Sequence, residues 1–269
     1  KWYCSGNKPT IKGTPNAMAE KDILGYLAYF HTALNFDEYW TCVIGNEVGT
    51  PVLKSFAKTK PSLPTLAKNA DISWYDKTKD TYTLDSTEDF RGFGYLSSLG
   101  MNFEDKTINL TADVALNTGN VNDRWEKWTP IGTPESEFAG EFNGNGHSIS
   151  GVYVTASQPG AGLFGGTAEG SAIKNLKLEN SYITSTARYV GSIVGSLSGD
   201  MENVYSSATV VTNSAYAGGL VGQIWSKEKV SMTRCWFAGN ATFKMSTGGL
   251  VGKIAQGTVT MTDCLNSGT

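Results

Sequence analysis

The sequence predicts an all-β fold, a right-handed parallel β-helix with a small α/β N-terminal capping module, and three observations support this prediction. First, glycine-flanked apolar pairs recur along the chain, and each ends on a glycine: Gly165, Gly195, Gly222 and Gly252. Second, these glycines are spaced by 30, 27 and 30 residues, a period typical of repeats that bury their apolar faces only by stacking on one another. Third, helical periodicity is absent from residue 105 onward, which favours strands throughout this region.

A strand is predicted after each glycine pair, because apolar and polar residues alternate there with a period of two. Aligning the segments that begin at residues 172, 200, 231 and 260 gives three columns whose side chains share one face of the strands. The columns are Ile173, Met201, Met232 and Met261; Leu176, Val204, Cys235 and Cys264; and Leu178, Ser206, Phe237 and Asn266. Stacked strands lie about 4.8 Å apart, so each column is expected to form a ladder.

A fourth column is polar and consists of Asn175, Asn203, Arg234 and Asp263. Arg234 and Asp263 carry opposite charges, so they are expected to pair between adjacent turns. We also expect the recurring glycines to let the chain turn sharply at the corners of each coil.

A short helix is predicted before the first coil. Ser86 and Asp89 have the spacing of a capping box, and the apolar residues that follow occupy one helical face at intervals of three and four residues. These residues are Phe90, Phe93, Leu96 and Leu99. A helix at this position would shield the open edge of the first coil.

The composition argues against several classes of function. The 269 residues carry a net charge of -3 and no basic stripe, so no nucleic acid is expected as a partner. No apolar run approaches the roughly 18 residues that cross a bilayer, so we expect no membrane insertion. The histidines are His31 and His147, and no CxxC pair occurs, so neither a metal nor a cofactor is expected. The chain begins at Lys1 without a signal-peptide pattern, which suggests a processed fragment of a longer protein.

The four cysteines fall into two pairs. Cys235 and Cys264 occupy equivalent repeat positions and are expected to be small buried apolar residues. A disulfide between Cys4 and Cys42 is an open alternative to free thiols if the compartment is oxidising.

Two further motifs precede the glycine repeats. They are W-x-P-I-G at residues 128–132 and F-x-G-x-F-x-G-N-G-H-x-I-S-G at residues 138–151. With these motifs in this order, residues 82–269 resemble the GLUG-repeat proteins, which are bacterial surface and secreted proteins with a parallel β-helix, often adhesins. The resemblance implies an extracellular location at the bacterial cell surface and a structural or adhesive role. It supplies no catalytic residue.

Residues 1–57 are similar to the segment that closes such solenoids, although here they precede the first coil. The similarity rests on WYCSGNK at residues 2–8, a helical pattern from about residue 16 to 34, and GTPVLKSF at residues 49–56. The predicted organisation is a capping module at 1–57, a linker at 58–73 and a parallel β-helix at 74–269 that stops in mid-coil.

An uncapped final coil would present unpaired N–H and C=O groups, which recruit another strand. Aligning Ser-Gly at 5–6 with Ser-Gly at 267–268 defines a head-to-tail interface. Its expected residues are Lys1, Trp2, Cys4 and Ser5 of one copy and Asp263, Cys264, Asn266 and Ser267 of the next. Such a contact does not close on itself, so it would build a filament. The alternative is a fragment cut from a longer tandem array, and both remain open.

Two other classes of function are considered. A carbohydrate-binding adhesin module would bind a host or cell-wall glycan or protein, with Trp125 as a stacking residue. A polysaccharide-active enzyme would need two carboxylates about 5–10 Å apart, for which the candidates are Asp113, Asp123, Glu126, Glu135 and Glu137. No column of carboxylates follows the coils, and His147 is expected to be a turn residue, so catalysis is not expected.

Overall fold

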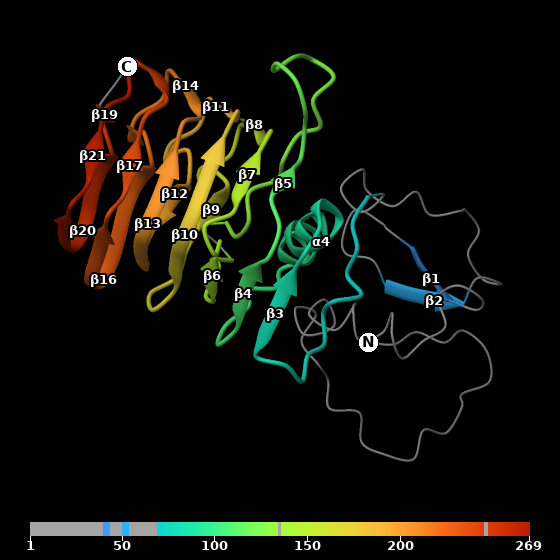
Figure 1. Ribbon diagram of the computed structural model, residues 1–269. Helices are drawn as coiled ribbons and strands as arrows, with labels where there is room; N and C mark the ends of the chain where they lie inside the picture. Colours follow the sequence, from blue (N-terminus) through green and yellow to red (C-terminus); the bar gives the residue numbers. More distant parts are fainter. Residues whose placement is uncertain (1–39, 44–49, 54–68, 134–135, 245–246) are drawn as a thin grey trace.

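The chain folds into a parallel β-solenoid (Figure 1). The computed structural model describes residues 40–43, 50–53, 69–133, 136–244 and 247–269. The described helix is α4 (Thr87–Ser98). The strands are β1 (Trp40–Val43), β2 (Thr50–Leu53), β3 (Thr81–Leu84), β4 (Thr107–Leu110), β5 (Val114–Ala115), β6 (Glu141–Asn143), β7 (Ser148–Ser150), β8 (Tyr153–Ala156), β9 (Phe164–Gly166), β10 (Ala172–Glu179), β11 (Tyr182–Ser185), β12 (Val194–Leu197), β13 (Asp200–Ser206), β14 (Thr209–Thr212), β15 (Ala217–Gly218), β16 (Val221–Thr233), β17 (Trp236–Phe237), β18 (Asn240–Phe243), β19 (Thr247–Gly248), β20 (Val251–Thr262) and β21 (Leu265–Asn266).

The solenoid has three sheet faces. Face one contains β3, β4, β6, β10 and β13, continued by the second halves of β16 and β20 and by the short strands β17 and β21. Face two contains β8, β11, β14 and β18. Face three contains β9 and β12 with the first halves of β16 and β20. All of these pairings are parallel, and strands of one face come from successive turns of the chain.

Within the predicted capping module, the structure describes an antiparallel pair, β1 with β2. The helix expected between about residues 16 and 34 lies outside the described residues. The boundaries predicted at 57/58 and 73/74 remain predictions. Among the described residues, the first strand paired into the solenoid is β3, which begins at Thr81.

The predicted apolar ladders are confirmed by the strand register. Ile173 pairs with Met201, Met201 with Met232, and Met232 with Met261. The first three of these side chains are at most 1% exposed. The same column continues upstream through Phe142, so it extends over coils that lack the glycine motif.

The polar column forms a corner of the coil rather than part of a flat strand. Asn175, Asn203, Arg234 and Asp263 all have left-handed backbone conformations, with φ between 51° and 53°. Asparagine tolerates this region better than most residues because its side chain bonds locally. The amide Nδ2 of Asn203 donates to Oδ1 of Asn175 at 3.0 Å, and Asn175 donates in the same way to Asn143. An amide ladder therefore holds this corner.

The expected ion pair between Arg234 and Asp263 is wrong. The guanidinium of Arg234 instead contacts the carboxylate of Glu202 at 2.5 Å. Glu202 lies one turn earlier and pairs with Thr233 in the strand register, so its side chain emerges beside that of Arg234.

The recurring glycines allow the backbones of adjacent turns to approach closely, and they do not form the sharp turns that the sequence predicted. Gly195, Gly222 and Gly252 are not among the residues with positive φ. A Cβ atom added at Gly222 would lie 2.3 Å from the backbone nitrogen of Val190, and one at Gly252 would lie 2.6 Å from the backbone of Ala217. Side-chain atoms do not approach backbone this closely, so glycine is required because there is no space.

The predicted helix and its cap are confirmed. Ser86 Oγ accepts a hydrogen bond from the Asp89 amide at 3.1 Å, while the Asp89 carboxylate accepts one from the amide of Asp85, one residue before the N-cap. Phe93 is fully buried and stacks on Phe142 at 5.8 Å between ring centroids. Helix α4 therefore closes the apolar interior at the N-terminal end of the solenoid, as the ribbon shows (Figure 1).

Candidate functional site: the terminal turn and the outer corner

The last turn that the structure describes comprises β20, β21 and the residues to 269, and we call it the terminal turn. Among the described strands, β20 pairs with β16, and β21 pairs with β17. Ile254, Met261 and Leu265 in this turn are 53%, 42% and 51% exposed. The terminal turn therefore presents apolar side chains along its outer edge.

The preceding turn shows what these positions require. Ile224 pairs with Ile254 and Met232 with Met261, and both partners in the earlier turn are fully buried. Burying a side chain of this size stabilises a protein by about 1.5–3 kcal/mol relative to full exposure. A further strand stacked on the terminal turn would recover part of this free energy.

Four of the predicted interface residues lie together in the terminal turn. Asp263, Asn266 and Ser267 are exposed, and Cys264 is half-buried. The Ser267 hydroxyl accepts a hydrogen bond from the indole Nε1 of Trp236 at 2.8 Å. Their expected partners Lys1, Trp2, Cys4 and Ser5 lie outside the described residues.

The two cysteines of the repeat are free thiols in adjacent turns. Cys235 is fully buried, as predicted, and burial raises the pKa of its thiol to about 12. The Sγ atom of Cys264 donates to the carbonyl of Met232 at 3.3 Å. The proposed disulfide between Cys4 and Cys42 involves side chains outside the described residues.

The structure argues against a glycan contact at Trp125. The indole is only 7% exposed and packs edge-on against Tyr153 at 6.3 Å between ring centroids. Its Nε1 is buried without a hydrogen-bond partner among the described residues. A ring buried in this way does not offer a face on which a sugar could stack.

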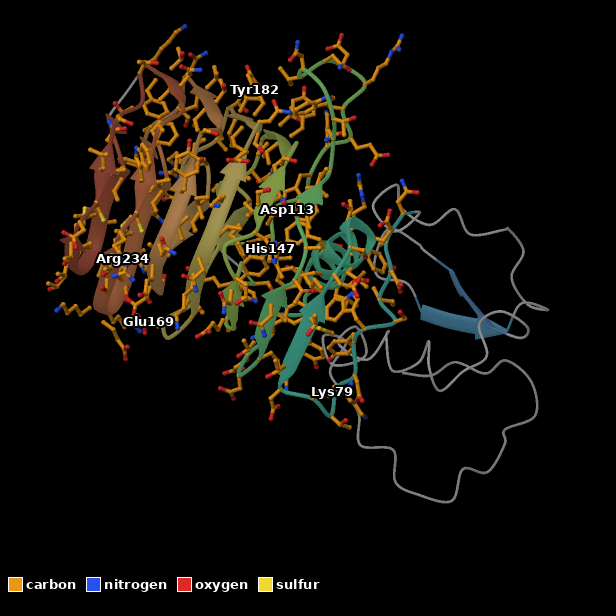
Figure 2. All side chains as sticks on the ribbon, viewed as in Figure 1. Lys79, Asp113, His147, Glu169, Tyr182 and Arg234 are labelled. Carbon is orange, nitrogen blue, oxygen red and sulfur yellow. The ribbon has the colours of Figure 1, made fainter. Side chains whose placement is uncertain are left out.

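His147 holds a turn beside Asp113, and both are labelled in Figure 2. Its Nδ1 lies 3.3 Å from the carboxylate of Asp113, which also accepts a hydrogen bond from the Ser148 amide at 2.8 Å. This backbone hydrogen bond, together with the contact to His147, lowers the pKa of Asp113. The interactions of Asp113 therefore connect the loop before β5 to the turn before β7 that contains His147.

The other candidate carboxylates have separate surroundings. Glu126 forms an ion pair with Arg91 at 2.7 Å. The pKa of Glu137 is raised, first by burial and second by the nearby charge of Glu169. Glu135 lies outside the described residues. Within the part of the chain that the structure describes, no group of three or more His, Cys, Asp or Glu residues could hold a metal ion. No described helix is long and apolar enough to span a bilayer.

A cluster of aromatic and basic side chains at the corner after face two was not anticipated from the sequence. Tyr189 and Tyr216 stack in adjacent turns, with ring centroids 6.0 Å apart and planes 14° apart. The ammonium of Lys253 lies 4.2 Å from the Tyr216 ring centroid, and the guanidinium carbon of Arg188 lies 5.6 Å from that of Tyr189. We call these four residues the outer corner. The sequence did contain one signal for the tyrosine pair, because a tyrosine lies two residues before a glycine in both RYVG and AYAG.

Comparison with known proteins identifies distant relatives. The chain is 33% identical over 124 residues to a protein assigned as a Gly-rich membrane protein of Evansella cellulosilytica, and 31% identical over 125 residues to Halomucin of Haloquadratum walsbyi. Each match covers 45% of this chain, but only 13% and 1% of the respective relative. The chain therefore corresponds to a small part of much longer proteins.

A protein of Bacteroides ovatus assigned as an immunoglobulin A1 protease resembles the chain in structure at 16% identity. The TM-score is 0.48, over 70% of this chain and 66% of that one. No family model matches the sequence, so the resemblance to GLUG-repeat proteins remains a prediction from the motifs.

Proposed function

We propose that this chain is a non-catalytic structural or adhesive module at the outer surface of a bacterial cell, and that it assembles head to tail. The exposure of Ile254 and Met261, whose counterparts one turn earlier are buried, is the observation that carries the assembly. One relative is named as a membrane protein, which supports a location at the cell envelope.

In this assembly, residues 1–57 of one copy complete the terminal turn of the next. The alignment of Ser-Gly at 5–6 with Ser-Gly at 267–268 stacks Trp2 on Cys264 and Cys4 on Asn266, and it brings Lys1 over Asp263. A tryptophan would then cover the apolar column, and opposite charges would meet. Parallel strand addition of this kind uses the free backbone groups of an edge for affinity and side-chain columns for register.

A disulfide trap tests both the contact and its register. Directly paired strands lie about 4.8 Å apart, within the Cα separation that a disulfide bridges. Cys42→Ser, Cys235→Val and Cys264→Val leave Cys4 as the remaining thiol, and Asn266→Cys adds its expected partner. Under oxidation we expect a ladder of covalent oligomers on a non-reducing gel.

Two control variants make the trap specific. The additional substitution Cys4→Ser removes the second thiol and should abolish the ladder. Moving the new cysteine to Ser267 shifts it by one residue, which turns its side chain to the opposite face of the strand. Equal cross-linking at 266 and 267 would contradict the proposed register.

Native mass spectrometry and negative-stain imaging of the unmodified chain test assembly without a cross-link. We expect oligomers and rods that are longer than one subunit. Met261→Glu places a charge in the apolar column two residues before the contact predicted at 263–267 and should shift the protein toward monomers. A strictly monomeric parent protein at tens of micromolar would refute the assembly.

The absence of catalysis is tested separately. Incubation with acidic polysaccharides should release no reducing ends above the background without protein. Release that disappears in the Asp113→Asn or Glu137→Gln variant would contradict the non-catalytic assignment.

A further inference from the structure

We propose that face two and the outer corner form a binding surface for an acidic polysaccharide. The sugar would pack against the outer edges of the stacked Tyr189 and Tyr216 rings, and Arg188 and Lys253 would pair with its carboxylate or sulfate groups. Three of the four residues of the outer corner lie on the side of the solenoid, and Lys253 belongs to the terminal turn.

The first observation is a partition of charge around the coil. The segments 152–168, 180–199, 203–227 and 234–262 contain no aspartate or glutamate, although they include the whole of face two and the corner that follows it. The carboxylates of the same coils lie on face one and its corners. They include Glu141, Glu169, Glu179, Asp200, Glu202, Glu228 and Asp263. In Figure 2, Tyr182 of face two lies at the opposite end of the coils from Glu169 and Arg234.

The second observation is that the cations on this side have no carboxylate partner. Arg188, Lys244 and Lys253 take part in none of the ion pairs found among the described residues. On face one, Lys174 pairs with Glu141 and Arg234 with Glu202, whereas Lys177 and Lys229 take part in none of these ion pairs. The side of face two differs because its own segments hold no carboxylate that could compensate its cations.

The third observation is that two tyrosines occupy a position that suits glycine. Tyr189 and Tyr216 have φ values of 67° and 65°, a region that a bulky side chain rarely adopts. The equivalent residue one turn earlier is Gly160, with φ of 89°, as the bridges from Ala161 to Val190 and from Val190 to Ala217 show. Backbone strain of this kind persists where the surrounding structure enforces it, and it clusters at functional sites. The fold requires a left-handed residue at this position, and glycine would supply one without strain. A tyrosine therefore contributes here only through the contacts of its side chain.

Face two supplies a hydroxyl-rich surface next to this corner. Tyr182 and Thr184 are half-buried and alternate with the fully buried Ile183, so their side chains lie on the outer side of the sheet. Tyr153 and Thr209 are the register partners of Tyr182 in the neighbouring strands. Hydroxyl groups both donate and accept hydrogen bonds, which matches a polyhydroxylated ligand.

These features together favour an acidic polysaccharide over other anions. Sugar C–H groups pack against the edges of aromatic rings through dispersion contacts, while Arg188 and Lys253 lie over the ring faces. The coil repeat aligns such groups along the solenoid axis, so an extended chain has more than one place to bind. Single-stranded nucleic acid also combines stacking with negative charge, and it serves as the competing ligand in the test.

The experiment measures binding of the full chain to polygalacturonate, to heparin and to neutral dextran at two salt concentrations. Polygalacturonate and heparin distinguish carboxylate from sulfate as the anionic group. We expect binding to at least one of them, weaker at higher salt, and no binding to dextran. The double variant Arg188→Gln with Lys253→Gln should weaken binding about tenfold or more.

Two further variants separate this site from general charge attraction and from misfolding. Lys177→Gln with Lys229→Gln removes the same charge from face one and should leave the affinity within about twofold of the parent. Tyr189→Gly with Tyr216→Gly keeps the backbone conformation that Gly160 already adopts and should weaken binding about tenfold. Thermal unfolding confirms that each variant is folded.

Three outcomes would overturn the proposal. They are the absence of binding to both acidic polysaccharides, equal losses for the face-one and outer-corner variants, and unchanged binding in the tyrosine variant. Tighter binding of single-stranded DNA with the same dependence on the tyrosines would assign the surface to nucleic acid instead. Binding is compared for the parent and for Met261→Glu, so a failure of assembly and a failure of this site are distinguishable.

Discussion

The close approach of turns at Gly222 gives a sharp prediction for the substitution Gly222→Ala. The added Cβ would lie 2.3 Å from the nitrogen of Val190, 2.4 Å from the carbonyl carbon of Tyr189 and 2.6 Å from the carbonyl oxygen of Gly195. All three contacts are backbone atoms that cannot rotate away. Because real Cβ atoms essentially never lie closer than 3.0 Å to another heavy atom, the two turns must separate by at least about 0.7 Å here.

That displacement breaks two hydrogen bonds between adjacent turns. Val190 donates to the carbonyl of Tyr216 at 3.1 Å and accepts from the amide of Gly218 at 3.0 Å, so an added 0.7 Å takes both beyond hydrogen-bonding distance. A buried polar group left unpaired costs about 1–3 kcal/mol. Gly222→Ala is therefore expected to lower the free energy of unfolding by about 3–5 kcal/mol.

Equilibrium urea denaturation measures this difference, with Gly170→Ala as the matched control. Gly170 has a φ of 78° but no atom within 4 Å of an added Cβ, so alanine there adds only left-handed strain of about 1–2 kcal/mol. If Gly222→Ala were no more destabilising than Gly170→Ala, the reasoning from close approach would be refuted.

Three further predictions concern the interior and the corners. Asn175→Ala removes both amide hydrogen bonds of a left-handed residue and should lower the free energy of unfolding by about 2 kcal/mol. Asn175→Gly relieves the backbone strain and should lower it by less. Urea denaturation compares the two variants. Phe93→Ala should cost about 3–5 kcal/mol, because this fully buried ring stacks on Phe142; a loss below 1 kcal/mol in thermal or urea unfolding would contradict its place in the core. The pKa of Cys235 is raised to about 12 by burial, so the native state holds this proton more tightly than the unfolded state, and its stabilising effect is complete below about pH 8.5 and is lost as the pH rises toward 12. Cys235→Val should flatten that part of the pH–stability curve.

Much of the fold follows from periodicity, and the reason is physical. A solenoid stacks equivalent residues of successive turns, so a column read from aligned repeats is also a contact in space. This is why Ile173, Met201 and Met232 were predicted as a ladder and pair in the observed register. Local signals were equally informative at the helix, where Ser86 and Asp89 identify the N-terminus of α4.

The sites are harder to predict, because exposure at a corner depends on backbone conformation. The sequence offered Trp125 as a residue on which a sugar could stack, whereas the structure buries it against Tyr153. In contrast, Trp225 and Trp236 are 52% and 43% exposed, although tryptophan is more often largely buried. The local sequence does not indicate whether the side chain of a corner residue points to solvent or to the interior.

By itself, the sequence determined the solenoid, the order of its apolar columns and the position of the helix at its N-terminal end. These depend on spacing along the chain, which a repeat converts directly into contacts. Only the tertiary structure decided that the glycines serve close approach, that Arg234 meets Glu202, and that Tyr189 and Tyr216 stack beneath Lys253. Those contacts join residues 27 or more positions apart through left-handed corners, so their geometry exists only once the turns are stacked.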